Sequence, residues 1–282
     1  MITTLADLVS INPSFKNAAV STFENTYNNA PASNGGTWLN DYYDDEGWWA
    51  LAWIKVYDIT NDGKYLSTAE TIFEDLWDKP YTQINSINNE LFLSVAAHLA
   101  NRVPSKKSSY QTYAVNQANW FLGTSLLSEN NTYHDGFTPS TCAVEGTVWT
   151  YNQGVILGAL VELSTATGST AWLDSAEKVA KGAVATLVDN NGILTETGSY
   201  PTNDADADQF KGVFARNLAV LQAVRGDSSY VTLLTKSADE LWRQDRNSAG
   251  QLGPDYQGAV YATSAPAQSS AMDCIIAAAA VS

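Results

Sequence analysis

Apolar residues recur at helical spacing along almost the whole chain. Leu51, Ile54 and Tyr57 follow one another at three-residue intervals, and comparable series occupy 91–99 and 155–163. A series of this kind buries one face of an α-helix. Alternation of apolar and polar residues, the pattern of a half-buried strand, is never sustained long enough to compete. The pattern therefore predicts an all-α protein.

The predicted helices are of two kinds, which alternate along the chain. Helices of the first kind are apolar or small on most sides, as burial on two faces requires, and we call them inner helices. They are predicted near 2–9, 45–58, 88–100, 149–166, 209–224 and 264–280. Helices of the second kind, the outer helices, are predicted near 13–28, 64–76, 106–122, 170–187 and 229–243. Short turns with Gly or Pro end each inner helix, and Ser, Thr or Asp begins the outer helix that follows.

Six inner helices with outer helices between them predict a ring of helical hairpins, the (α/α)6 barrel. The turn pattern repeats along the chain, and no Pro/Ser/Gly-rich linker divides it, so residues 1–282 are expected to form a single domain. The count leaves one outer helix short. We therefore expect the N-terminal outer helix to be lacking from this chain.

The connections between the predicted helices are unequal in length. Turns from inner to outer helices are a few residues long, whereas connections from outer to inner helices are long. The long connections are 29–43, 77–87, 123–147, 188–207 and 244–262. Helix connections usually take ~2–8 residues, and longer loops commonly carry function. Because all of them lead to the start of an inner helix, they predict a cleft at that end of the barrel.

Charge excludes several classes of function. The chain has 15 Lys and Arg against 30 Asp and Glu, a net charge of −15, which repels phosphate backbones and anionic lipids. We therefore expect no nucleic-acid partner. Because no apolar run approaches the ~20 residues that cross a bilayer, we also expect no membrane span. The chain shows no basic-then-apolar leader.

Aromatic residues are frequent, with 9 Trp, 14 Tyr and 8 Phe, many beside Asn, Asp or Gly. This composition is common among secreted proteins that handle carbohydrates. Two cysteines, Cys142 and Cys274, and two histidines, His98 and His134, are too few for a Cys- or His-based metal site. Whether the two cysteines pair is left open.

Polar and aromatic clusters open the inner helices. They are 40–49, 88–90, 149–154, 208–212 with Arg216 one turn later, and 268–270. In the hairpin arrangement these clusters surround one opening. Amides can bond sugar hydroxyls and aromatic rings can stack on sugar C–H surfaces, so the clusters favour a neutral polyol ligand.

Asp44 and Asp45 are the sharpest candidates for catalysis. Glycoside hydrolysis with retention needs two carboxyl groups ~5–5.5 Å apart, one as nucleophile and one as general acid/base. Side chains of adjacent residues diverge from Cα atoms ~3.8 Å apart and reach about that separation. The helix N-terminus favours one ionised carboxylate, while burial and the neighbouring charge raise the pKa of the other. The alternative is that the two residues only cap a helix.

Four segments together resemble glycoside hydrolase family 76, and their residues are most similar to those of its secreted fungal members. They are Tyr43-Asp44-Asp45-Glu46-Gly47-Trp48-Trp49, Asn89-Glu90-Leu91-Phe92, Trp149-Thr150-Tyr151-Asn152-Gln153-Gly154 and Gln209-Phe210-Lys211-Gly212. The resemblance covers essentially the whole chain. It implies an (α/α)6 barrel and an endo-acting α-1,6-mannanase that works with retention, without cofactor or metal. It also implies Asp44 as the nucleophile and Asp45 as the general acid/base.

Nine further residues are expected to bind substrate: Tyr43, Trp48, Asn89, Tyr151, Gln153, Glu196, Phe210, Lys211 and Arg216. The alternatives are structural. Tyr151 and Gln153 could close a loop, and Lys211 and Arg216 could pair with carboxylates and tune their pKa values. Acidic residues at 204–208 resemble a calcium loop but lack the Gly and Glu of an EF-hand, so no metal site is predicted.

The chain also departs from the pattern of the family. It lacks a fuller N-terminal region, a Cys-Gly-Gly-Gly segment before Trp77, and a cysteine in the acidic loop before Phe210, so it looks truncated.

Two alternatives to a hydrolase stay open. One is a cell-wall transglycosidase that passes mannan to another glycan, and the other is a non-catalytic glycan-binding protein. We expect a monomer that binds α-1,6-linked mannan, secreted or associated with the cell wall.

Overall fold

The computed structural model describes residues 1–78, 85–197 and 205–282. Its inner helices are α1 (Ile2–Ile11), α3 (Tyr43–Thr60), α5 (Ser86–Arg102), α7 (Thr150–Thr167), α9 (Phe210–Val224) and α11 (Ala265–Val281). Its outer helices are α2 (Lys16–Asn29), α4 (Gly63–Asp78), α6 (Lys107–Phe121), α8 (Ala171–Thr186) and α10 (Ser228–Gln244). The predicted elements are confirmed, with their ends within a few residues of the expected positions.

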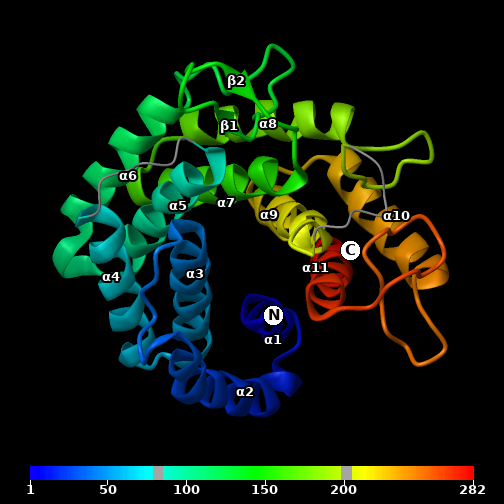
Figure 1. Ribbon diagram of the computed structural model, residues 1–282, viewed down its shortest axis with the longest axis horizontal. Coiled ribbons are helices and arrows are strands. Elements are labelled where there is room, and N and C mark those ends of the chain that lie inside the picture. Colours follow the sequence, from blue (N-terminus) through cyan, green and yellow to red (C-terminus); the bar gives the residue numbers. More distant parts are fainter. Residues whose placement is uncertain (79–84, 198–204) are drawn as a thin grey trace.

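The inner helices form a closed ring. Each packs against the next, and α11 returns to pack against α1, where the hydroxyls of Thr4 and Ser269 are 2.9 Å apart. Figure 1 shows this ring with the outer helices around it and with the first and last helices, α1 and α11, side by side. The described residues supply six inner and five outer helices. The structure is therefore the predicted (α/α) barrel, with one outer helix fewer than inner helices in its described part.

Burial separates the two kinds of helix as the sequence predicts. Of the 17 residues of α5, 14 are buried, whereas α10, of the same length, buries six along one stripe. An inner helix is covered by its two ring neighbours and by outer helices, so few of its positions reach solvent. The inner helices therefore form the core and carry whatever polar groups the barrel encloses.

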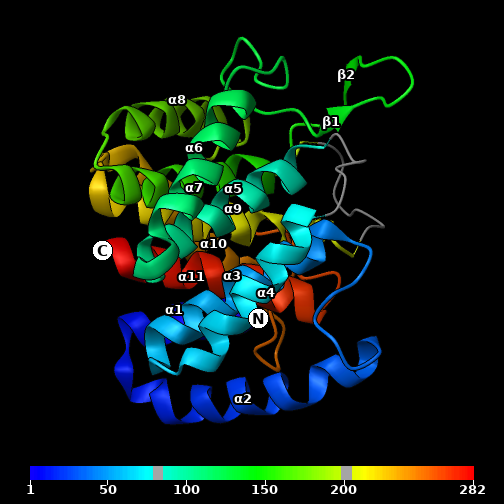
Figure 2. The same ribbon diagram turned by 90° about the vertical axis from the view of Figure 1, so that its left-hand side faces the viewer.

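The long connections gather at the end of the barrel where the inner helices begin, as expected (Figure 2). One of them contains a short hairpin, β1 (Gly136–Phe137) with β2 (Val144–Glu145), paired antiparallel. The hairpin is an addition to the predicted all-α pattern, and it is too short to show alternation in the sequence. Asn85 pairs with Gly136 across the start of α5, which anchors the hairpin to the barrel.

Two glycines set how closely the inner helices approach one another at this end. A Cβ at Gly154 of α7 would lie 2.6 Å from the Cα of Phe214 on α9. A Cβ at Gly212 of α9 would lie 2.5 Å from the Cα of Ser270 on α11. Because the atoms in contact belong to the backbone, no side chain can rotate to make room. Glycine is therefore required for α7, α9 and α11 to cross at this spacing.

Two of the predicted connections are described only in part. The segment 79–84 and residues 198–204, including Asp204 of the acidic loop, lie outside the described residues. Cys142, on the β1–β2 loop, is exposed and Cys274, in α11, is buried, and both are free thiols. None of the helices in the described ranges is both long and apolar enough to cross a membrane.

Candidate active site

Asp44 and Asp45 lie in the first turn of α3, at the end of the barrel where the long connections meet. Asp44 is partly buried and Asp45 is exposed. The residue that precedes the helix, Tyr42, is the N-cap and makes no side-chain capping bond. Asp45 instead accepts a hydrogen bond from the side chain of Asn40, 3.1 Å away. The two carboxyl groups thus lie at this end of the barrel without capping the helix through Tyr42, and their position at a helix N-terminus favours negative charge.

The connection before α3 holds Asp45 in a defined environment. The backbone N–H of Asn40 donates a hydrogen bond to the buried Glu46, at 2.7 Å, and so closes the loop onto the helix. Although Asp45 is largely exposed, partial loss of its hydration raises its pKa; the bond from Asn40 opposes this rise, and the charges of Asp44 and Asp206 add to it. A carboxyl group with a raised pKa is suited to protonating a leaving group.

Tyr151 and Phe210 form an aromatic platform in the same cleft. Their rings stack with centroids 4.0 Å apart and planes 11° apart, and Trp149 meets Phe210 edge-on at 5.6 Å. Tyr151 opens α7 and Phe210 opens α9, so the stack depends on the close approach of these helices at Gly154. Aromatic faces of this kind suit the C–H surface of a sugar ring, so these two predicted residues are well placed for binding.

A third carboxylate, Asp135, contacts the platform through Tyr151. Its Oδ1 accepts hydrogen bonds from the hydroxyl of Tyr151 and from the amide of Asn152, both at 3.2 Å. Burial raises the pKa of Tyr151, and the charges of Asp135, Glu90 and Asp44 raise it further. The hydroxyl of Tyr151 therefore stays protonated and lies among acidic groups that include the first aspartate of the pair.

Trp48 belongs to a small apolar cluster on the barrel axis. Ile87, Leu91, Val155 and Val213 are buried there, and Trp48, Leu51 and Tyr151 pack against them. Trp49 turns the other way and stacks on Trp53 at 5.8 Å in the main core. The two neighbouring indoles thus pack in different clusters, Trp48 with residues of α5, α7 and α9, and Trp49 in the main core.

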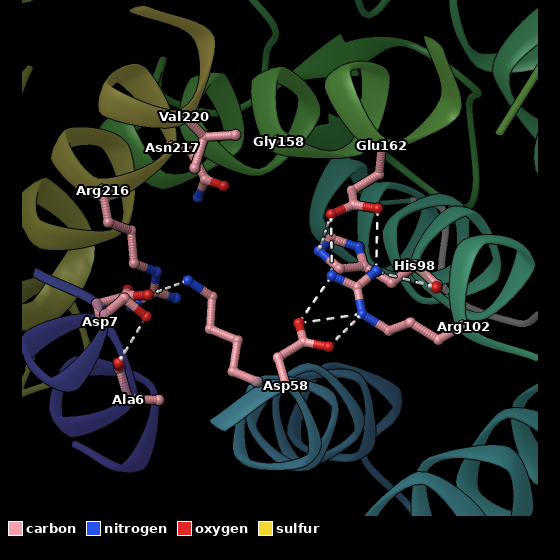
Figure 3. Close-up of a pocket in the computed structure, with 12 residues that line it drawn as sticks. Ala6, Asp7, Asp58, His98, Arg102, Gly158, Glu162, Arg216, Asn217 and Val220 are labelled. Atoms are coloured by element: carbon pink, nitrogen blue, oxygen red, sulfur yellow. Dashed lines mark hydrogen bonds and ion pairs between the residues drawn. The ribbon is translucent and has the colours of Figure 1, made fainter. Parts of the chain in front are cut away.

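Arg216 lies deeper in the barrel than expected. Its guanidinium group pairs with Asp273 at 2.8 Å and sits 5.7 Å from the ring centre of Trp48. It also lines a polar pocket of about 140 Å³ between the later turns of five inner helices. Figure 3 shows this pocket, in which Arg102 bridges Asp58 and Glu162. The contact of Arg216 with Trp48 favours support of the cleft floor rather than contact with a ligand above it.

Asn89 and Gln153, both expected to bind substrate, are buried, and their amides bond to the protein itself. Asn89 is 5% exposed, donates to the carbonyl of Asn85 and accepts from Gln117. Gln153 is 0% exposed and bonds to both backbone groups of Tyr133 and to the carbonyl of Trp149. Their amides are used to fix neighbouring segments, which is the alternative role considered for Gln153.

Glu196 and Lys211 are also buried, at 4% and 1% exposed. Glu196 accepts hydrogen bonds from the backbone and hydroxyl of Thr150 and so anchors the start of α7. Lys211 donates to the carbonyl of Pro254 at 2.6 Å and lies 4.7 Å from the ring centre of Tyr256. Burial raises the pKa of Glu196 and lowers that of Lys211, while each charge partly offsets the other. Glu196 thus ties its segment to the start of α7, and Lys211 ties α9 to the connection that contains Pro254. Tyr43, partly buried, packs against the main core.

Comparison with known proteins identifies the family. The model of glycosyl hydrolase family 76 matches residues 4–281. The chain belongs to glycosyl hydrolase family 76. A mannan endo-1,6-alpha-mannosidase, DCW1, of Saccharomyces cerevisiae is 26% identical over 209 residues, which are 63% of this chain and 45% of that protein. DCW1 of Candida glabrata is 30% identical over 150 residues, 51% of this chain and 32% of that protein. The chain thus matches less than half the length of these curated relatives.

Solved structures share the fold. An inactive variant of the α-1,6-mannanase GH76A of Salegentibacter, in complex with α-1,6-mannotriose, superposes with a TM-score of 0.88 and 20% identity. The match covers 100% of this chain and 88% of that one. The Lin0763 protein of Listeria innocua superposes with a TM-score of 0.85 and 26% identity, covering 99% of this chain and 84% of that chain.

Asp135 and Trp149 contact the Tyr151–Phe210 platform and Tyr42 precedes the aspartate pair, yet none of the three was among the predicted site residues. Asp135 lies in a long connection without periodicity, just before the hairpin, and its carbonyl accepts a hydrogen bond from the backbone N–H of Ser86 at the start of α5. Tyr42 is 63% exposed beside the aspartate pair. No group of three or more His, Cys, Asp or Glu residues that could hold a metal ion occurs in the described ranges.

Proposed function

We propose that this family 76 protein is an endo-acting glycoside hydrolase that cleaves α-1,6-mannosidic linkages in mannan with retention. The consecutive carboxyl groups of Asp44 and Asp45, in a cleft with the Tyr151–Phe210 platform, carry the proposal. Two comparisons support it. The curated relatives are named mannan endo-1,6-alpha-mannosidases. The superposed α-1,6-mannanase was made inactive by replacing two consecutive aspartates.

In the proposed mechanism, Asp44 attacks the anomeric carbon of the mannosyl unit while Asp45 protonates the departing glycosidic oxygen. A covalent mannosyl-enzyme forms with inversion. Asp45, now ionised, takes a proton from water, and the water attacks the anomeric carbon from the other face. Asp44 then leaves, and the second inversion restores the original configuration. The raised pKa of Asp45 supports its role as the acid of the first step.

The assay of this proposal is incubation with linear α-1,6-mannan, with products separated by size. We expect a ladder of short oligosaccharides, and NMR during the reaction should show the α-anomer first. Asp45→Asn removes the acid and should lower turnover by about 10²–10⁴-fold. Asp41→Asn, an exposed neighbour in the same connection, is the matched control. Full activity of Asp45→Asn would overturn the assignment, and a β-anomer as first product would overturn retention.

Transfer of mannan to another glycan is distinguished in the same assay by adding acceptor sugars. Products longer than the substrate would favour a transglycosidase with the same two aspartates. Mannan binding without any product, by a well-folded protein, would instead favour a glycan-binding protein.

We further propose that residues 1–282 act as one catalytic domain and as a monomer, since helices from both ends of one chain complete the ring. Mannan-rich cell surfaces are the proposed place of action.

A further inference from the structure

Glu90 is a buried carboxyl group that the proposed mechanism does not use. It lies in the second turn of α5, is 0% exposed, and neither of its oxygens has a hydrogen-bond partner among the described residues. An ionised carboxylate without partners is costly to bury, because it loses its hydration and gains nothing in exchange. Its environment therefore has to be explained.

Helix geometry directs Glu90 toward the segment that carries Asp135. The backbone N–H of Ser86 donates to the carbonyl of Asp135 at 2.7 Å, and the hydroxyl of Ser86 donates to the carbonyl of His134. Residues four apart on a helix lie on the same face. Glu90 follows Ser86 by four residues, so it lies over the stretch 133–136, next to the carboxylate that holds Tyr151.

The groups around Glu90 are acidic or neutral. Asp135 is the described residue whose charge acts on Glu90, and it is negative. The hydroxyl of Tyr133 and the Oδ1 of Asn152 are both on buried residues and also lack a hydrogen-bond partner among the described residues. Burial above all, and then the charge of Asp135, raise the pKa of Glu90 well above its ordinary value. Ionising two neighbouring carboxyl groups without a cation between them costs free energy. The fully buried group, Glu90, is therefore the one that keeps its proton.

We propose that Glu90 is a neutral carboxylic acid in the folded protein and a positioning residue of the active site. In this role its O–H donates a hydrogen bond toward Asp135 through a bound water, which the Tyr133 hydroxyl and Asn152 Oδ1 also reach. Asp135 in turn holds the hydroxyl of Tyr151, so that the ring of Tyr151 stays stacked on Phe210. The effect on catalysis rests on the proposed function, whereas the protonation state of Glu90 does not.

Two variants of nearly equal size separate the functions of this side chain. Glu90→Gln keeps a neutral hydrogen-bond donor, and Glu90→Leu keeps the volume but removes hydrogen bonding. We expect Glu90→Leu to lower kcat/KM on α-1,6-mannan by about tenfold, the worth of a well-placed hydrogen bond. Glu90→Gln should restore most of this loss with an unchanged pH profile of kcat/KM. A larger loss in Glu90→Gln than in Glu90→Leu, or a shifted pH profile, would mean that the working group is an ionised carboxylate and would overturn the proposal.

Infrared difference spectroscopy tests the protonation state without any substrate. The spectrum of the wild type minus that of Glu90→Gln at pH 7 should contain the C=O stretching band of a protonated carboxyl group. The band should change frequency in an Asp135→Asn background, because the bridging water then meets a neutral amide in place of a carboxylate. If the band is absent, the proposal fails whatever the kinetics show. If the band is present but the wild type does not cleave mannan, the proposed function fails while the neutral state of Glu90 stands.

Discussion

The side-chain amide of Asn40 donates a hydrogen bond to Asp45, with Nδ2 3.1 Å from Oδ2, across the start of α3. A hydrogen bond to an ionised carboxylate favours the ionised form. Partial burial of Asp45 acts in the opposite direction and raises its pKa. Asn40, in the connection before α3, therefore limits how far the pKa of Asp45, the proposed acid/base, can rise.

Asn40→Ala should move the alkaline limb of the pH profile. Without the bond, the pKa of Asp45 rises further, so its carboxyl stays protonated, and active as an acid, to higher pH. We expect the alkaline limb of kcat/KM to shift to higher pH, while kcat falls because the carboxyl is less well held. Asn34→Ala, which loosens the same connection by removing bonds to Thr37 and Leu39, is the control. An equal shift in that variant would show that loop mobility, and not the Asn40 contact, is responsible.

Removal of the aromatic platform should weaken substrate binding. Phe210→Ala takes away the partner of the Tyr151 ring and an apolar face of the cleft, so KM for mannan should rise by about tenfold. Phe15→Ala, which truncates a phenylalanine exposed on the outside of the barrel, controls for loss of aromatic surface. Initial rates over a range of mannan concentrations separate KM from kcat. A KM equal to that of the wild type would mean that this ring does not contact mannan.

Gly154→Ala should damage both stability and activity. The added methyl group would meet the backbone of Phe214 and push α7 away from α9. Overpacking of this kind costs ~2 kcal/mol, which lowers the melting temperature by roughly 4–8 °C. Because Tyr151 and Phe210 stand on these two helices, kcat/KM should also fall in the variant at temperatures where it is fully folded. Gly63→Ala, at a helical glycine with open space around it, is the matched control. A melting temperature equal to that of the control would contradict the expected clash.

The stability of the 245–262 connection should depend on pH through Asp245. Burial raises the pKa of this carboxyl to about 6, although its bond from the backbone N–H of Tyr256 favours the ionised form. A raised pKa in the folded state adds stability below the ordinary pKa of 3.8, and this stability is lost as the pH rises through 6. Asp245→Asn stays neutral. Its stability relative to the wild type should therefore grow by up to ~3 kcal/mol between pH 4 and pH 7.

Urea unfolding at several pH values measures this difference. Asp239→Asn is the control, because Asp239 is exposed on α10, the helix that Asp245 caps. It should leave the pH dependence of the free energy of unfolding unchanged. If Asp245→Asn follows the wild type at every pH, the carboxyl is already ionised throughout the range and the expected burial effect is wrong.

The barrel could be predicted from the sequence because helical periodicity and turn chemistry are local properties. The position of Asp44 and Asp45 followed from the same reasoning, since the long connections all lead to the starts of inner helices. What the sequence could not show is which side of an inner helix faces the cleft. Tyr151 and Gln153 are two residues apart on a helix that is buried nearly all round, so no contrast between polar and apolar faces distinguishes them. Asp135 was missed because a loop residue has no periodicity to reveal its neighbours.

The backbone contacts at Gly154 and Gly212 also bear on how this barrel can acquire new specificities. Where helices touch main chain to main chain, exchanging side chains in the core does not change their spacing, and any larger residue at the glycines separates them. The floor of the cleft is thus a fixed frame, whereas the connections at its rim can lengthen or shorten without disturbing the ring. Variation in the length or branching of the accepted glycan should therefore arise from insertions and deletions in the loops. Engineering of the site is best directed to the same segments.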